Sequence, residues 1–262
     1  MSSPPSLLDW KNRTVLITGA TAGFGTAFAH RYAAVGARLI LCGRRTERLE
    51  ALAAQLSVPV HAVTLDVRDR PAVETALGNL PAAFADVDVL VNNAGLALGL
   101  EPASKASLDD WEIMVDTNLK GLMIVTRTIL PGMVARDRGH IVNIGSVAGT
   151  YPYPGGNMYG ATKAAVAQFS RNLAADLVNT AIRVTNIEPG LCSGSEFSQV
   201  RFHGDEDRAA KVYEGAVSLT PDDVAEAVFW TTALPRHVNI TRVEMMPVGQ
   251  APAGLAVHRP KV

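Results

Sequence analysis

Short apolar runs alternate with helical patterns along the whole chain, and this alternation limits the possible folds more than any other feature of the sequence. The runs are almost continuously apolar, as is typical of strands that are covered on both faces. They lie at residues 14–18, 38–42, 59–65, 87–92, 139–144, 182–187 and 241–246. Alternating strands and helices build βαβ units. The sequence therefore predicts one α/β domain over residues 1–262, a Rossmann-type doubly wound parallel sheet of about seven strands flanked by helices.

Two of the intervening helices have clear start signals. After Leu108, apolar residues recur near a 3.6-residue period as far as Thr126, and Ser107 with Asp110 forms a capping pattern ahead of them. Thr220 and the proline and acidic residues that follow it predict the start of a later helix.

Composition and charge exclude several classes of protein. The net charge of the 262 residues is −1, so the overall charge does not indicate a basic surface for nucleic acid or for an anionic membrane. No apolar run reaches the ~18 residues that a membrane span needs, and the N-terminus lacks the pattern of a secretory signal. Two cysteines and six scattered histidines provide neither a disulfide framework nor the spacing of a metal site. We expect a cytoplasmic protein without a metal.

A glycine-rich turn follows the first predicted strand. In "TGATAGFG", residues 18–25, the glycines allow a tight turn and let a diphosphate approach backbone N–H groups, while the following helix, predicted from Thr26 to Val35, offers its positive end. The spacing is GxxxGxG rather than GxGxxG, so a connection without a ligand is the alternative; the strand–turn–helix context favours a dinucleotide site. The predicted cofactor contacts in this turn are Gly19, Thr21, Gly23, Phe24 and Gly25.

Adjacent arginines stand where the second strand ends. Sites that prefer NAD usually place an acidic residue here for the ribose hydroxyls, but this chain has Arg44 and Arg45 and no acid before Glu47. Arginine forks suit the 2′-phosphate of NADP, so the sequence predicts NADP(H) as the cofactor; solvated arginines at a helix start are the alternative. After the third strand, Asp66, followed by Val67, is either a ligand of the adenine amine or a turn residue.

Tyr159 precedes Lys163 by four residues, which places both side chains on one face of a helix. A phenol with an ordinary pKa near ~10 is a poor base at pH 7, and making phenolate dominant requires about 4 kcal/mol. An ammonium group ~4 Å away supplies about 4 kcal/mol at an effective dielectric near 20. The pair therefore predicts that Lys163 lowers the pKa of Tyr159 and makes it a usable general base.

Together with these features, further motifs in the same order resemble the short-chain dehydrogenase/reductase family over nearly the whole chain. They are "LDV" (65–67), "NNAG" (92–95), "DTNLKG" (116–121), "NIGS" (143–146) and "EPG" (188–190). The resemblance implies Tyr159 as general base and acid and Lys163 as a ligand of the nicotinamide ribose. It also implies that Ser146 holds the substrate oxygen and that Asn118 supports a water chain to Lys163. A turn role for Ser146 and a helix kink at Asn118 are the alternatives.

The same resemblance implies further cofactor contacts. Asn93 and Gly95 pack around the adenosine ribose in the family, although bracing of the sheet is an equal alternative. A loop that closes over nicotinamide and diphosphate corresponds to residues 189–197, with the contacts Pro189, Gly190, Cys192 and Ser195. Many relatives carry threonine where this chain has Gly194, so backbone groups or nearby serines have to make that contact. Cys192 is interpreted as a small packing residue.

Longer segments are similar to bacterial NADP-dependent 3-hydroxy acid dehydrogenases. These are "NNAGLALGLEPASKAS" (92–107), "GSVAGTYPYPGGNMYGATK" (145–163) and "IEPGLCSGSEFSQVRF" (187–202). The resemblance implies that the substrate is a small 3-hydroxy acid or its aldehyde or keto form: serine, allo-threonine, 3-hydroxyisobutyrate, or 3-hydroxypropionate with malonic semialdehyde. Arg201 and His203 are the candidate partners of the substrate carboxylate, with mobile surface residues as the alternative.

Two other functions are compatible with these motifs: a broader ketone or 3-oxoacyl reductase with the same catalytic group, and an NADP-sensing regulator without activity. Retention of Ser146, Tyr159 and Lys163 argues against the regulator. Family members often assemble as tetramers through their last helices and tail, so we expect a homotetramer in which residues 249–262 take part in contacts.

Overall fold

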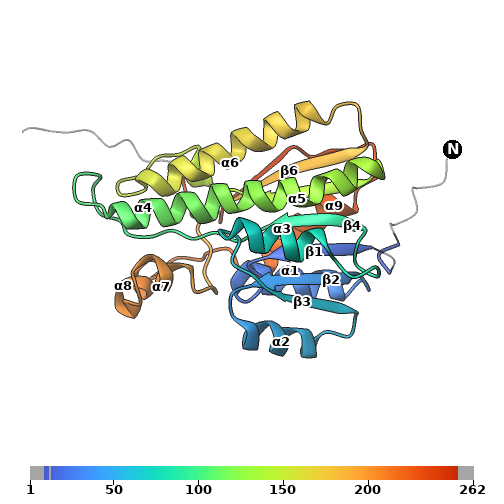
Figure 1. Ribbon diagram of the computed structural model, residues 1–262. Coiled ribbons are helices and arrows are strands. Elements are labelled where there is room, and N and C mark those ends of the chain that lie inside the picture. The colour runs from blue at the N-terminus through green and yellow to red at the C-terminus, as the bar shows by residue number, and fades with distance from the viewer. Residues whose placement is uncertain (1–8, 12, 253–262) are drawn as a thin grey trace, which may run out of the picture.

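A seven-stranded parallel sheet forms the centre of the computed structural model, which describes residues 9–11 and 13–252 (Figure 1). Its strands are β1 (Thr14–Thr18), β2 (Arg38–Gly43), β3 (Val60–Thr64), β4 (Val87–Asn92), β5 (Gly139–Ile144), β6 (Ile182–Pro189) and β7 (Arg242–Met245). They lie in the order β3-β2-β1-β4-β5-β6-β7, and every neighbouring pair is parallel. The predicted single α/β domain with a doubly wound parallel sheet is confirmed.

Helices cover both faces of this sheet. The α-helices are α1 (Gly23–Ala33), α2 (Thr46–Gln55), α3 (Arg70–Gly78), α4 (Leu108–Val115), α5 (Leu122–Ala135), α6 (Asn157–Asp176), α7 (Phe197–Arg201), α8 (Glu206–Lys211) and α9 (Pro221–Ala233). One apolar core joins the sheet to α1, α2 and α9, and a second joins it to α3, α5 and α6 (Figure 1). None of the helices in the described part of the chain is long and apolar enough to cross a membrane.

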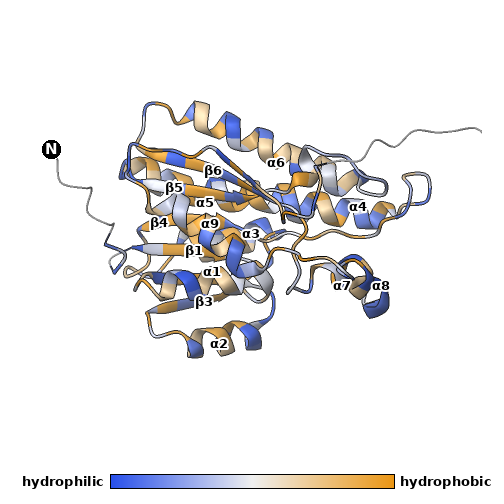
Figure 2. Cartoon of the chain, turned by 180° about the vertical axis from the view of Figure 1, so that it is seen from behind, coloured by the Kyte–Doolittle hydropathy of each residue, from blue (hydrophilic) through white to orange (hydrophobic). Residues whose placement is uncertain are grey.

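Alternate residues of each strand supply the two cores. In β1, Val15 and Ile17 pack on the side of α1, and Leu16 between them packs on the opposite side; all three are fully buried. Burying such a side chain stabilises the fold by roughly 1.5–3 kcal/mol. Figure 2 shows the result as apolar strands beneath helices whose outer faces are hydrophilic. The nearly continuous apolar runs of the sequence reflect burial on both faces of the sheet.

The predicted helix starts are largely confirmed, with two differences. Ser107 accepts a hydrogen bond from the backbone N–H of Asp110, and Thr220 forms a capping box with Asp223. However, α1 begins at Gly23 rather than Thr26, so the last residues of the glycine turn already form the first turn of the helix. The long helix predicted after Leu108 is interrupted by a π-helical turn, η1 (Asp116–Gly121), which joins α4 to α5.

The strand order turns back between β1 and β4, since the chain builds β2 and β3 on one side of β1 and the remaining strands on the other. The carboxyl ends of strands at such a switch point frame a crevice that binds ligands in open α/β sheets. After β6, the chain enters α7 and α8, which stand apart from both helical layers (Figure 1). The predicted tail contacts fall mostly on residues 253–262, which lie outside the described residues.

Candidate active site

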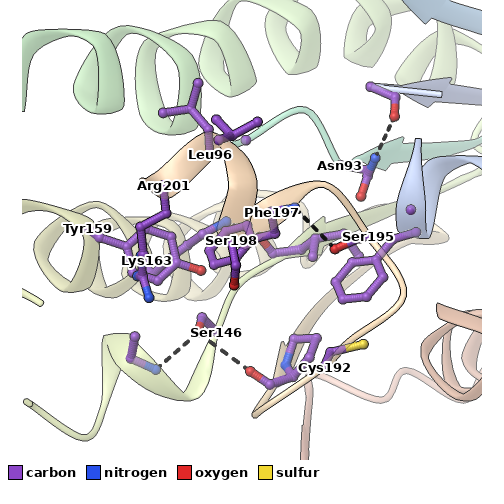
Figure 3. Close-up of a pocket in the computed structure, with 18 of the residues that line it drawn as sticks. Asn93, Leu96, Ser146, Tyr159, Lys163, Cys192, Ser195, Phe197, Ser198 and Arg201 are labelled. Carbon is purple, nitrogen blue, oxygen red and sulfur yellow. Dashed lines mark hydrogen bonds between the residues drawn. The ribbon is translucent and has the colours of Figure 1, made fainter. Parts of the chain in front are cut away.

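A cavity of about 900 Å³ opens at the carboxyl ends of the strands, at the upper end of the volumes typical of cofactor sites. The segments that follow β1 to β6 all contribute to its wall. The predicted site residues that line it are Gly19, Thr21, Gly23, Phe24, Arg44, Arg45, Asp66, Val67, Asn93, Gly95, Ser146, Tyr159, Lys163, Pro189, Gly190, Cys192, Ser195 and Arg201. Residues from opposite ends of the chain therefore meet at one cavity, shown in close-up in Figure 3.

Gly25 and Asn118 are not part of this wall. A Cβ atom on Gly25 would lie 2.2 Å from the carbonyl oxygen of Gly19, so Gly25 lets the start of α1 pack directly against the turn. Asn118 is 1% exposed and uses its amide to bridge both backbone groups of Leu96, each at 2.8 Å. Its amide nitrogen also donates to the hydroxyl of Thr162. Asn118 thus braces the loop after β4 from behind the cavity.

The glycine turn fits a bound diphosphate. Gly19 lies in the cavity wall with φ +65°, a left-handed conformation that favours glycine, and a Cβ there would lie 3.0 Å from Ala94 Cα. Close approach of a ligand to the backbone is therefore possible where a larger residue would intrude. The N-terminus of the 11-residue helix α1 follows directly and offers its positive end to an anion.

The two predicted phosphate-binding arginines differ in their surroundings. Arg44 is exposed, lines the cavity and forms no ion pair with another residue of the described chain. Arg45 instead bonds the hydroxyl of Thr21 and forms an ion pair of 2.8 Å with Glu196. Arg44 is thus the cation that is available to an incoming phosphate.

Asp66 and Asn93 both have structural partners as well as a place in the cavity wall. The guanidinium of Arg68 binds Asp66 at 2.6 Å and holds the pKa of its carboxyl below the usual range. Asn93 donates through its amide to the carbonyl oxygens of Thr18 and Gly19, at 2.9 and 3.1 Å. The bracing role considered for Asn93 is therefore present, and it positions the glycine turn beside the loop after β4.

Tyr159 is buried at the start of α6, and burial raises the pKa of its phenol to about 12. A hydrogen bond with Ser146 and the charge of Arg201 oppose this rise. The structure therefore corrects the expectation that Lys163 lowers the pKa of Tyr159: desolvation outweighs the attraction of nearby cations in the protein alone. The cation that acts most directly on the phenol is Arg201, whose Cζ lies 5.2 Å from the ring centroid.

Lys163 lies one turn after Tyr159 and is 7% exposed. Its Nζ donates a hydrogen bond of 2.8 Å to the carbonyl oxygen of Ile144 and lies 5.8 Å from the centroid of the Tyr159 ring. Burial lowers the pKa of this ammonium to about 8. The lysine is thus anchored to the end of β5 with its remaining N–H groups available to the cavity.

Ser146 ends the loop after β5 and is almost fully buried. Its hydroxyl accepts from the N–H of Ala148 at 3.1 Å and donates to the carbonyl oxygen of Pro189 at 3.5 Å (Figure 3). The turn role considered for this residue is therefore present, since Ser146 caps the short 3₁₀ helix η2 (Val147–Gly149). The same hydroxyl is close enough to Tyr159 to lower the pKa of the phenol.

Arg201 of α7 reaches across the cavity to the aromatic side chains around Tyr159 (Figure 3). It donates a hydrogen bond of 2.7 Å to the hydroxyl of Tyr153, and its Cζ lies 5.1 Å from the ring centroid of Phe197. Its buried Nε has no hydrogen-bond partner among the described residues. His203, the other candidate, points away to pair with Asp110 at 3.1 Å on the exposed side. Of the two candidates for the substrate carboxylate, Arg201 is therefore the one that faces Tyr159.

The loop after β6 closes one side of the cavity. Ser195 lines the cavity, whereas the hydroxyl of Ser193 accepts from Ser218 at 2.7 Å, so Ser195 is the serine available to a ligand. Burial raises the pKa of the Cys192 thiol to about 12, which fits its interpretation as a small packing residue. The amide oxygen of Gln250 accepts from the N–H of Leu191 at 2.7 Å and holds the loop in place.

Several residues of the cavity wall had no signal in the sequence. Tyr153 and Phe197 surround the reaction centre, and Glu196 and Gln250 fix the loop after β6. Their roles depend on contacts between segments that are far apart along the chain. The described residues contain no group of three or more histidine, cysteine or acidic side chains that could hold a metal ion.

Several known proteins have sequences similar to this chain. The family model described as short chain dehydrogenase matches residues 13–205. The NADP-dependent 3-hydroxy acid dehydrogenase YdfG of Salmonella typhi is 62% identical over 245 residues, which cover 94% of this chain and 99% of that protein. The serine 3-dehydrogenase of Agrobacterium fabrum is 49% identical over 246 residues, which cover 94% of this chain and 98% of that protein.

Solved structures agree with the sequence comparisons. The closed form of serine dehydrogenase complexed with NADP+ superposes with a TM-score of 0.93 at 59% identity, and the match covers 94% of this chain and 100% of that one. Serine dehydrogenase from Escherichia coli superposes with a TM-score of 0.81 at 54% identity, over 91% of this chain and 99% of that one. The chain therefore belongs to the short-chain dehydrogenase family.

Proposed function

We propose that this protein is an NADP-dependent oxidoreductase that transfers hydride between NADP and the 3-hydroxyl carbon of small 3-hydroxy acids. The observation that carries the proposal is the cavity itself, in which a buried phenol and a half-buried guanidinium face one another. The names of the relatives supply the substrate class: 3-hydroxy acids for one and serine for the other. Candidate substrates are serine, allo-threonine, 3-hydroxyisobutyrate and 3-hydroxypropionate, with malonic semialdehyde in the reverse direction.

The cofactor half of the site runs from the glycine turn to the arginines. Gly19 and Gly23 admit the diphosphate, and the N-terminus of α1 contributes its positive end. Arg44 binds the 2′-phosphate and gives the preference for NADP over NAD. The other contacts are Thr21, Phe24, Arg45, Asp66, Val67, Asn93, Gly95, Pro189, Gly190, Cys192 and Ser195. Gly25 supports this turn by packing against Gly19 rather than by contacting the cofactor.

Catalysis centres on Tyr159. Bound NADP+ supplies the hydride acceptor and a positive charge. Tyr159 takes the proton of the substrate hydroxyl as general base and returns it as general acid in the reverse reaction. Ser146 holds the substrate oxygen beside the phenol and lowers the pKa of the phenol. Lys163 holds the nicotinamide ribose and passes protons outward, and Asn118 keeps the adjoining loop in place for this path.

The carboxylate of the substrate binds Arg201. The buried Nε of this half-buried guanidinium has no hydrogen-bond partner among the described residues, which is costly unless a ligand completes its hydrogen bonds. A carboxylate accepts from two guanidinium nitrogens at once, which suits this side chain better than a neutral group does. Because the guanidinium faces the Tyr159 ring at 5.2 Å, a small acid anchored there has its hydroxyl close to the phenol.

Initial rates of NADP+ reduction test this function most simply, with L-serine, L-allo-threonine and 3-hydroxyisobutyrate as substrates and NAD+ as the alternative cofactor. Turnover that favours NADP+ with any of these acids supports the proposal. The second candidate function is a broader ketone or 3-oxoacyl reductase, which the aromatic wall of Tyr153 and Phe197 favours. A panel of uncharged ketones and thioesters that outperforms the free acids establishes that second function instead.

The assembly and location of the protein extend the same proposal. We expect a homotetramer, as in many members of the family, with residues 249–262 among its contacts; light scattering measures the mass directly, and a monomeric mass contradicts this expectation. Both cysteines are free thiols, as suits a reducing compartment such as the cytoplasm.

A further inference from the structure

Arg45, the N-cap residue of α2, and Arg48 within α2 hold a carboxylate from the far side of the cavity. Glu196, at the start of α7, forms an ion pair of 2.8 Å with Arg45 and another of 2.7 Å with Arg48. Each arginine binds a different oxygen of the carboxylate, and these contacts hold the pKa of Glu196 below its ordinary value. These ion pairs connect residues that are at least 148 positions apart in the sequence.

Glu196 belongs to a segment that is part of neither the sheet nor its two helical layers. Residues 191–213, the lid segment, leave β6 and carry α7 and α8, which stand apart from the helical layers (Figure 1). Other polar contacts attach the lid segment on the opposite side: Gly99 donates to the carbonyl oxygen of Arg201, and His203 pairs with Asp110. Glu196 attaches it to the side of α2. Its contacts therefore span the mouth of the cavity.

The lid segment also crosses the glycine turn at this point. An added Cβ on Gly23 would lie 2.6 Å from the Cβ of Ser195, the residue next to Glu196. A ligand whose diphosphate lies in that turn thus sits beneath the lid segment and cannot leave freely while Glu196 is held.

The net positive charge of Arg44, Arg45 and Arg48 with Glu196 favours binding of a second anion. Arg44, Arg45 and Arg48 carry three positive charges, and Glu196 neutralises one of them. A 2′-phosphate with nearly two negative charges balances the remainder without displacing Glu196, because Arg44 is unpaired within the described chain. Binding of the phosphate and pairing of Glu196 are therefore compatible.

We propose that Glu196 with Arg45 and Arg48 is a latch that holds the lid segment over the cofactor, while Arg44 is the arginine without an ion pair in the described chain that binds the 2′-phosphate. The second part rests on the proposed function, because it depends on the cofactor being NADP. The latch itself does not, since its ion pairs involve only side chains of this chain.

Hydrogen–deuterium exchange of the full-length, cofactor-free protein tests the latch. Exposed ion pairs contribute little individually, so we expect Glu196→Gln to speed amide exchange across the lid segment by about two- to fivefold. Arg48→Gln should have a smaller effect in the same residues, because Arg45 still holds Glu196. Adding Arg48→Gln to Glu196→Gln should change nothing further, as expected for residues that act through one interaction.

The matched control is Glu74→Gln, which makes the same chemical change in the exposed pair of Arg70 and Glu74 on α3. It should leave exchange in the lid segment unchanged. Exchange that is equally slow in wild type and in Glu196→Gln would overturn the latch, as would independent, additive effects of the two substitutions.

Release of the cofactor gives a second readout. The fluorescence of bound NADPH and NADH reports their dissociation rates, and Glu196→Gln should raise both rates by a similar factor. If Glu196→Gln instead tightens NADPH binding and leaves NADH unaffected, Glu196 competes with the 2′-phosphate and the latch is wrong. Failure to oxidise any hydroxy acid would count against the proposed function alone, because neither exchange nor cofactor release depends on the substrate.

Discussion

The guanidinium of Arg201 faces the ring of Tyr159, with its Cζ atom 5.2 Å from the ring centroid. The two residues come from α7 and α6, and the same arginine donates to the hydroxyl of Tyr153 at 2.7 Å. One cation is thus placed both to attract a substrate anion and to influence the base. Each role leads to its own prediction.

Loss of Arg201 should weaken the binding of acids selectively. A hydrogen-bonded charge contributes about 1.5–3 kcal/mol, so we expect Arg201→Ala to raise the KM for 3-hydroxyisobutyrate about 10- to 100-fold. Steady-state kinetics with this acid and with an uncharged secondary alcohol make the comparison. Arg208→Ala is the control, because Arg208 lies over Phe202, outside the cavity wall. An unchanged KM for the acid, or an equal loss with the alcohol, contradicts the carboxylate role.

The same substitution should shift the pH profile. Burial raises the pKa of Tyr159, and the charge of Arg201 opposes that rise, with a net pKa of about 12. Without that charge, more alkaline conditions are needed to deprotonate the phenol, so Arg201→Gln should move the rising limb of kcat/KM to higher pH. Arg201→Lys should restore part of the shift. A profile that stays in place would mean that Arg201 does not act on the base.

Arg44 should determine the choice of cofactor. It lines the cavity and has no ion pair within the described chain, whereas Arg45 is held by Thr21 and Glu196. Arg44→Ala should lower kcat/KM for NADP+ about 10- to 100-fold through the loss of one arginine–phosphate contact, and should leave NAD+ nearly unaffected. Initial-rate kinetics with both cofactors measure this difference. Equal losses with both cofactors would indicate a structural role for Arg44.

The buried charge of Lys163 should lower the free energy of unfolding of the cofactor-free protein. Its pKa is lowered from 10.5 to about 8, so at pH 7 the folded protein carries the cost of a buried charge, and this cost disappears as the pH rises through 8 to 10.5. Replacing Lys163 also removes its hydrogen bond to the carbonyl oxygen of Ile144, and this loss offsets about 1 kcal/mol of the stability gained. We expect Lys163→Met to raise the free energy of unfolding by about 1–2 kcal/mol at pH 7.

Denaturant unfolding at pH 7 and pH 10 checks this prediction. The gain from Lys163→Met should shrink at the higher pH, where Lys163 is largely neutral in the folded protein. Lys105→Met, at an exposed position, should have little effect at either pH. A loss of stability at pH 7, or a gain of the same size at both pH values, would show that burial of the charge is not the cause.

Local patterns were sufficient to predict the sheet. The run at residues 14–18 coincides with β1, and the run at 59–65 overshoots β3 by one residue at each end. Burial on both faces produces these runs directly, so they are visible without tertiary information. The π-helical turn around Asn118 was not predicted, because the apolar period continues through it and the amide contacts with Leu96 are not encoded locally.

Chemistry that a single segment carries could be predicted from the residues of that segment. Tyr159 and Lys163 lie on one helix, and the glycine turn is continuous, so both could be identified from their spacing. Glu196 and Arg48 were not predicted, because they are 148 positions apart and meet only through the path of the lid segment. Burial likewise decides the pKa of Tyr159, and the sequence alone does not give the degree of burial.

Replacement of Tyr159 by phenylalanine tests the central claim most directly, with turnover of 3-hydroxyisobutyrate and NADPH binding measured on the same protein. Tyr159→Phe removes the hydroxyl and keeps the ring that packs against Phe197. A positioned general base contributes about 10²- to 10⁴-fold, so we predict at least a ~100-fold loss of kcat with NADPH affinity nearly unchanged. Activity within about tenfold of wild type would contradict the assignment of Tyr159 as the catalytic base.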